Sequence, residues 1–218
     1  KQTRGILSLG VSSLITEVSS GIVMLLFNQI LLSLSGNVGV AAYGIIANLA
    51  LIVVSIFTGV AQGIQPIVSR SFGSGQMRHV KQIFHYGVIT AAAFGLLFLG
   101  IGWFFSQPIV GIFNQENNLE MERLASQGLP LYFLAFPMMG VNILASSYLA
   151  SLSKGGPAFV LSVLRGAAAV IPAVLLLSRL FGITGVWLAV PCAEALTFLV
   201  FLAMLPFCFR RPQKGAGA

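Results

Sequence analysis

Five carboxylate side chains are the only acids in the sequence, and two of them lie inside long apolar runs. All five are glutamates, and three of these, Glu116, Glu120 and Glu122, fall in or beside a polar link where a solvated surface is expected. On a helix, Glu17 would lie roughly 18 Å from the start of the first apolar run, and Glu194 lies at a similar depth in the last. At that depth an ionisable group costs several kcal/mol unless it faces a cavity or a partner.

A carboxyl group near mid-membrane can exchange a proton or a monovalent cation, and it can also meet a cationic substrate. Glu17 and Glu194 are therefore the candidates for cation or proton coupling. The alternative for Glu17 is a protonated side chain that only bonds a neighbouring helix. For Glu194 the alternative is a structural ion pair with Arg165, which lies in the preceding apolar run.

Polar side chains at similar depth could line a substrate cleft, although each alone is more often an interhelical hydrogen bond. The candidates, with one aromatic wall residue, are Asn28, Asn48, Gln62, Gln65, Tyr132, Phe136, Asn142 and Ser146. Prolines remove a backbone donor and bend helices, so they indicate hinges or only shape. Pro137 and Pro172 lie nearest mid-membrane and are the hinge candidates.

Enzyme chemistry is not expected. His79 and His85 do not form a cluster with metal-ligand spacing, and there is no Walker-type phosphate loop. Cofactors are not expected either, apart from Na⁺ or H⁺ as a coupling ion, with Glu17 as the position for Na⁺. Cys192 and Cys208 are too far apart along one helix to form a disulfide.

The elements that must position these residues are membrane-spanning helices. The chain has 218 residues, of which 57% are hydrophobic and only 8% charged, too few charges for a wetted surface. Backbone in lipid must satisfy its own hydrogen bonds, which predicts an all-α bundle. Six apolar runs are long enough to cross a bilayer, and together they predict one six-helix transmembrane domain over residues 1–218. The expected spans are 5–34, 41–68, 83–105, 122–150, 157–178 and 183–207.

The basic residues set the expected orientation. If the N-terminus is cytoplasmic, ten of the twelve lysines and arginines fall on the inner side, and only Arg123 and Arg179 fall outside. Both termini are then cytoplasmic, in what we expect to be a bacterial cytoplasmic membrane. A nucleic-acid partner is not expected, because no basic surface is interleaved with stacking aromatic residues.

Three motifs resemble the multidrug and toxic compound extrusion (MATE) family of transporters, and the similarity covers essentially the whole chain. They run from Gly44 to Asn48, from Gly59 to Pro66 followed by Ser71-Phe72-Gly73-Ser74-Gly75, and from Gly185 to Pro191 followed by Ala193-Glu194. The resemblance is to the C-terminal six-helix lobe of a twelve-helix transporter. It implies a chain that holds one of two lobes, without its N-terminal lobe, as a truncated or separately expressed half. The first residue, Lys1, agrees with that expectation.

The resemblance also implies roles for particular residues. Glu17 matches the acidic residue in the first helix of the C-terminal lobe, which takes part in cation coupling in the family. Some members carry a second acid in the tenth helix, but the corresponding stretch from Leu129 to Ser147 has none. Coupling through Glu17 with neutral ligands such as Asn142, or coupling by protons, stays open.

The sequence therefore predicts half of a secondary active multidrug exporter, an antiporter of cationic or amphipathic compounds. Its partners would be membrane lipid, the small-molecule substrate and the missing lobe. Two alternatives remain. One is a lipid-linked oligosaccharide flippase of related architecture, against which the single intramembrane arginine, Arg165, argues weakly. The other is a non-transporting membrane scaffold, which predicts that Glu17 is buried against a partner without a cavity beside it.

Overall fold

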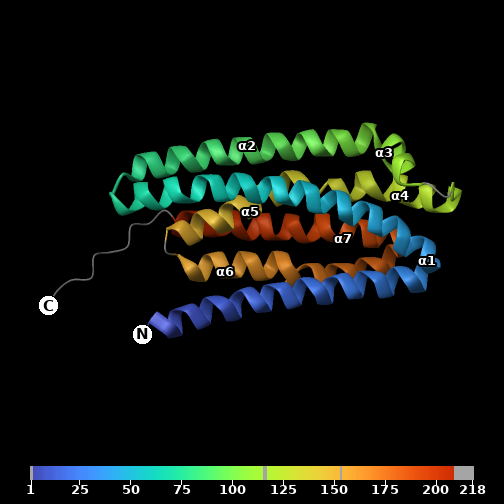
Figure 1. Cartoon of the computed structure of the whole chain (residues 1–218), viewed down its shortest axis with the longest axis horizontal. Coiled ribbons are helices and arrows are strands. Elements are labelled where there is room, and N and C mark those ends of the chain that lie inside the picture. The colour runs from blue at the N-terminus through green and yellow to red at the C-terminus, as the bar shows by residue number, and fades with distance from the viewer. Residues whose placement is uncertain (1, 115–116, 153, 209–218) are drawn as a thin grey trace.

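The computed structural model describes the backbone of residues 2–114, 117–152 and 154–208, and the side chains of 21–114, 117–152 and 154–205. The described part of the chain is helical and contains no strand (Figure 1). The sequence prediction of an all-α bundle is confirmed. The helical elements are α1 Gln2–Gly73, α2 Met77–Phe104, α3 Ser106–Phe113, α4 Leu119–Phe133, α5 Phe136–Ser151, α6 Gly155–Val163, the π-helical turn η1 Leu164–Ala168 and α7 Val170–Cys208.

Two single glycines reverse the chain inside long helices. Gly36 divides α1 and Gly182 divides α7, with φ of 62° and 57° in the left-handed region that glycine tolerates best. Figure 1 shows both consequences: the two arms of α1 run along the bundle in opposite directions, with α6 and α7 between them in this view, and α7 returns beside α6. The described helices therefore pass along the bundle six times, with α4 and α5 together making one pass.

Three helical stretches are long and apolar enough to cross a membrane: Gly21–Gly73, Met77–Phe104 and Gly155–Leu205. Joining α4 to α5 across their bend gives a fourth. The first and third stretches have 53 and 51 residues, whereas one crossing needs about 20. Each of these two contains one of the glycine reversals, which accounts for the difference between the stretches and the six spans expected from the sequence.

Two of the expected spans are interrupted. The span 122–150 is divided into α4 and α5, which meet at an angle of 48°. Pro137 stands in the first turn of α5 and has no N–H to donate to the carbonyl of Phe133, so the helix cannot continue straight through this point. The span 157–178 is interrupted by η1, which lies just before Pro172.

Helices α2 and α5 pack against each other along an interface where glycines allow close contact. A Cβ atom on Gly95 of α2 would lie 2.5 Å from the Cα atom of Pro137, and one on Gly140 of α5 would lie 2.7 Å from the ring of Phe57. The rings of Phe57 and Phe136 meet edge to face in this core. Small residues that let helices approach closely are the usual source of helix association in lipid.

Candidate functional site

A cavity of about 410 Å³ opens between the two arms of α1, the α4–α5 unit and the α6–α7 unit. Its charged wall residues are Arg165 of η1 and Glu194 of α7. Five residues with hydroxyl groups line it from four elements: Tyr43, Tyr132, Ser146, Ser147 and Ser162. Apolar side chains such as Phe27 and Met139 complete the wall. We refer to this space as the Glu194 cavity.

The carboxylate of Glu194 is held by a charged donor and a neutral one. Arg165 Nε donates to Glu194 Oε1 at 2.8 Å, while Asn142 Nδ2 donates to Oε2 at 2.7 Å and to the Glu194 carbonyl at 2.9 Å. The side chain of Glu194 is 3% exposed and that of Arg165 is 26% exposed. The ion pair that the sequence left open for Glu194 is therefore present, and it lies on the wall of a cavity.

The rotation of α5 brings the polar residues to this cavity. Met139, Ile143 and Ser146 recur every three or four residues, so they share one face of the helix, and all three line the Glu194 cavity. Asn142 lies on the same side and reaches α7. Pro137, Gly140 and Leu144 occupy the opposite side, against α2. Asn142 Oδ1 and Ser146 Oγ are buried and have no hydrogen-bond partner among the described residues.

The structure brings together four of the residues selected from the sequence. Tyr132, Ser146 and Glu194 line the Glu194 cavity, and Asn142 bonds to Glu194. Asn48, Gln62 and Gln65 are exposed elsewhere on α1, and Asn28 is half-buried there. Phe136 is fully buried in the aromatic core with Phe133 and Phe57. The helix that carries Glu17 is described, but its side chain lies outside the described residues, so its role stays a prediction.

The two hinge candidates lie at interruptions of helices. Pro137 follows the bend between α4 and α5, and Pro172 follows η1. Whether either bend moves stays a prediction. Sequence reasoning did not select Tyr43 or Ser162, which also line the cavity. Nothing in their local sequence distinguishes them from ordinary helix residues, because their position depends on how distant helices pack.

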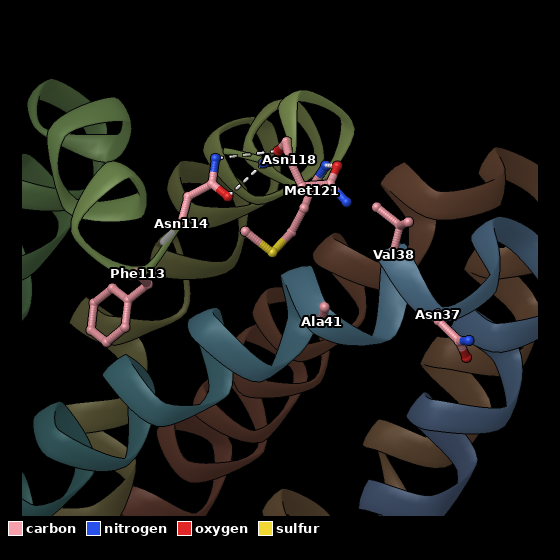
Figure 2. A pocket seen from close by; sticks show the side chains of 7 residues that line it. All are labelled: Asn37, Val38, Ala41, Phe113, Asn114, Asn118 and Met121. Carbon is pink, nitrogen blue, oxygen red and sulfur yellow. Dashed lines mark hydrogen bonds between the residues drawn. The ribbon is translucent and has the colours of Figure 1, made fainter. Parts of the chain in front are cut away.

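A second cavity, of about 390 Å³, lies near the Gly36 reversal and is drawn in Figure 2. Two of its polar residues, Asn114 and Asn118, join the end of α3 to the start of α4 by hydrogen bonds. Asn114 accepts a hydrogen bond from the Asn118 backbone at 2.9 Å and donates to Glu122 at 3.0 Å, and Asn118 caps α4 through Met121. Glu122, expected on a solvated surface, therefore also bonds to the residue that follows α3.

Side-chain clusters able to hold a metal ion, counted as three or more His, Cys, Asp or Glu residues, do not occur in the described part of the chain. The polar residues that line the Glu194 cavity carry one carboxylate, one guanidinium and hydroxyls, and the buried amide of Asn142 bonds to that carboxylate. These groups can bind a proton or a monovalent cation on the carboxylate, and they can hydrogen-bond a small polar molecule.

The apolar bundle of six passes, with a chain reversal at Gly36 and another at Gly182, has the architecture of an integral membrane protein. The MatE family model matches residues 10–176. The chain therefore belongs to the MatE family, as its motifs led us to expect. It is an integral membrane protein, although its orientation in the membrane stays a prediction.

Curated relatives and solved structures agree with this assignment. The chain is 26% identical to the multidrug export protein MepA of Staphylococcus haemolyticus over 199 residues, covering 91% of this chain and 42% of that protein. For MepA of Staphylococcus aureus the identity is 26% over 204 residues, covering 92% of this chain and 43% of that protein.

Among solved structures, the Vibrio cholerae MATE transporter VcmN superposes with a TM-score of 0.86 at 17% identity, covering 98% of this chain and 49% of VcmN. A MOP superfamily transporter from Pyrococcus furiosus superposes with a TM-score of 0.82 at 15% identity, covering 94% and 47%. These similarities show the fold. The chain thus spans less than half the length of the relatives and structures that it matches.

Proposed function

We propose that this chain forms one lobe of a secondary active exporter, which moves cationic or amphipathic compounds across the membrane in exchange for a proton or a monovalent cation. The observation that supports this most directly is the carboxylate of Glu194, buried in an apolar bundle yet on the wall of a cavity. A purely structural scaffold gives no reason for a cavity at that place. The names of the MepA relatives support the choice of multidrug compounds as substrates.

Coupling in this proposal uses the carboxylates of the lobe. Glu194 has Asn142 and Ser146 beside it, which together offer an amide oxygen and a hydroxyl oxygen without a described hydrogen-bond partner. Oxygen ligands of this kind suit a hard monovalent cation, and the carboxylate alone suits a proton. Glu17, predicted at similar depth, is the second coupling residue of the proposal.

The experiment measures export by the two-lobe protein in inside-out membrane vesicles, with tetraphenylphosphonium as a cationic probe. Sodium and proton gradients are collapsed separately, which identifies the coupling ion. Glu194→Gln and Glu17→Gln should each abolish ion-driven export while the amount of inserted protein stays the same.

The matched control is Glu120→Gln, because Glu120 is an exposed carboxylate in the first turn of α4. That variant should export normally. If export by both Glu194→Gln and Glu17→Gln equals that of the unmodified protein, the proposed coupling is wrong.

A further inference from the structure

Both oxygens of the Glu194 carboxylate already accept a hydrogen bond. Oε1 accepts from Arg165 Nε at 2.8 Å, and Oε2 accepts from Asn142 Nδ2 at 2.7 Å. A proton or cation that binds this carboxylate must therefore replace or weaken one of the two existing contacts. The two donors differ in how readily they can leave.

Asn142 is the fixed donor. Its side chain is fully buried, and the same Nδ2 atom also bonds to the backbone carbonyl of Glu194 at 2.9 Å. These contacts join α5 to α7 at one point, so withdrawal of Asn142 would require the two helices to separate.

Arg165 is the donor that can move. It has a long side chain, is 26% exposed and faces the Glu194 cavity, which gives the guanidinium space to enter. Its removal breaks a contact between side chains without separating two packed helices. The guanidinium keeps its positive charge wherever it goes, because arginine does not lose its proton in proteins.

The backbone under Arg165 is also irregular. Residues Leu164–Ala168 form a π-helical turn, in which Ala169 N bonds to Leu164 O at 3.0 Å across five residues. Pro172 has no N–H to offer the Ala168 carbonyl, so the regular α-helical bond is missing immediately after the turn. Turns of this kind are frequent at functional sites. Moving the extra residue along the helix rotates each residue that it passes by about 100°.

We propose that Arg165 is a tethered counter-ion for Glu194, which the coupling cation displaces during transport. This inference rests on the proposed function, since it describes the regulation of the same site. In the observed pair Arg165 neutralises Glu194. When a proton or a monovalent cation takes its place, the guanidinium turns into the cavity, assisted by the π-helical turn.

Displacement of Arg165 by the coupling cation makes cation binding and drug binding oppose each other. While Arg165 pairs with Glu194, their charges cancel and the site is neutral. When a proton or cation neutralises Glu194 instead, the guanidinium of Arg165 keeps its positive charge in the cavity. One positive charge is thereby added to the space that Tyr43 and Tyr132 also face. A cationic compound is repelled by that charge, so cation binding and drug binding oppose each other, as antiport requires.

The first test measures the cation dependence of export by the two-lobe protein in vesicles. Arg165→Gln removes the competitor, so the half-saturating concentration of the coupling cation should fall at least about tenfold, the usual effect of deleting an opposite charge in contact with a carboxylate. In Arg165→Lys the half-saturating cation concentration should stay closer to that of the unmodified protein. The control is Arg179→Gln, an exposed arginine on the same helix unit that should cause no change.

The second test needs no transport. Dicyclohexylcarbodiimide adds to protonated carboxyl groups in apolar surroundings, and mass spectrometry of the labelled two-lobe protein locates the adduct. Glu194 should be labelled several-fold more in Arg165→Gln than in the unmodified protein or in Arg179→Gln, and Na⁺ should protect it if Na⁺ is the coupling ion. Equal labelling of Glu194 in the three proteins would contradict the proposal that Arg165 is its displaceable counter-ion. This outcome is independent of the export assays of Glu194→Gln, which test the proposed function.

Discussion

The two sides of α5 differ in how they meet their neighbours. On one side Gly95 of α2 lies so close to Pro137, and Gly140 so close to Phe57 of α1, that a Cβ atom added to either glycine would collide with backbone or ring atoms. On the other side Ser146 lines a cavity of about 410 Å³, whose wall also includes the Arg165–Glu194 pair. One helix thus separates a close-packed apolar interface from a polar, open one.

This difference indicates which interface can change during transport. Close-packed helices shift only with many contacts broken at once, because interiors are packed as densely as organic crystals. The polar side depends on a few hydrogen bonds and has free volume into which side chains can move. We therefore expect α2 and α5 to move as one unit, and the η1 region to change relative to them.

The largest stability effect is expected on the apolar side. In Gly95→Ala the new Cβ atom would lie 2.5 Å from Pro137 Cα and 2.8 Å from its nitrogen, and neither backbone atom can yield without moving α5. We expect a loss of about 2–3 kcal/mol, measured as unfolding of the detergent-solubilised protein. Gly100→Ala on the same helix meets nothing within 4 Å and serves as the control. Equal stability of the two variants would contradict the rigid interface.

An intermediate effect is expected on the polar side. Asn142→Leu keeps a similar volume but removes both hydrogen bonds to Glu194, one of them to its carboxylate. The same unfolding measurement should show a loss of about 2 kcal/mol. In the control Asn48→Leu, the lost bond is to Gly44 within the same exposed turn, and we expect a change below about 0.5 kcal/mol. If Asn142→Leu leaves the free energy of unfolding unchanged, the packing of α5 against α7 does not depend on this contact.

The smallest stability effect, paired with a change in rate, is expected at the π-helical turn. Pro172→Ala restores an N–H for the Ala168 carbonyl, so stability should change by about 1 kcal/mol or less. Export by the two-lobe protein should nevertheless slow several-fold, because a regular helix resists the rotation of Arg165. Pro108→Ala is the control, since Pro108 stands in the first turn of α3, where a missing N–H is tolerated. If Pro172→Ala exports at an unchanged rate, Pro172 does not act as a hinge.

The sequence predicted the helices better than their contacts. Apolar run length and the glycines of the turns indicate six passes, because both are local properties. The pairing of Arg165 with Glu194 was one of two alternatives, since matched depth in neighbouring helices allows a contact without requiring it. That Asn142 holds the same carboxylate could not be predicted, because it depends on the 48° bend that orients α5. The π-helical turn has no local signature apart from the proline that follows it.

The reversal at Gly182 has a mechanical consequence. A single residue joins the two arms there, with no loop to lengthen or shorten, so the arm that carries Arg165 cannot slide past the arm that carries Glu194 at that end. Any axial displacement between them must be taken up within a helix. The extra residue of the π-helical turn η1 can take up such a displacement. This turn of 5 residues can therefore accommodate movement between the two arms of a hairpin of 51 residues.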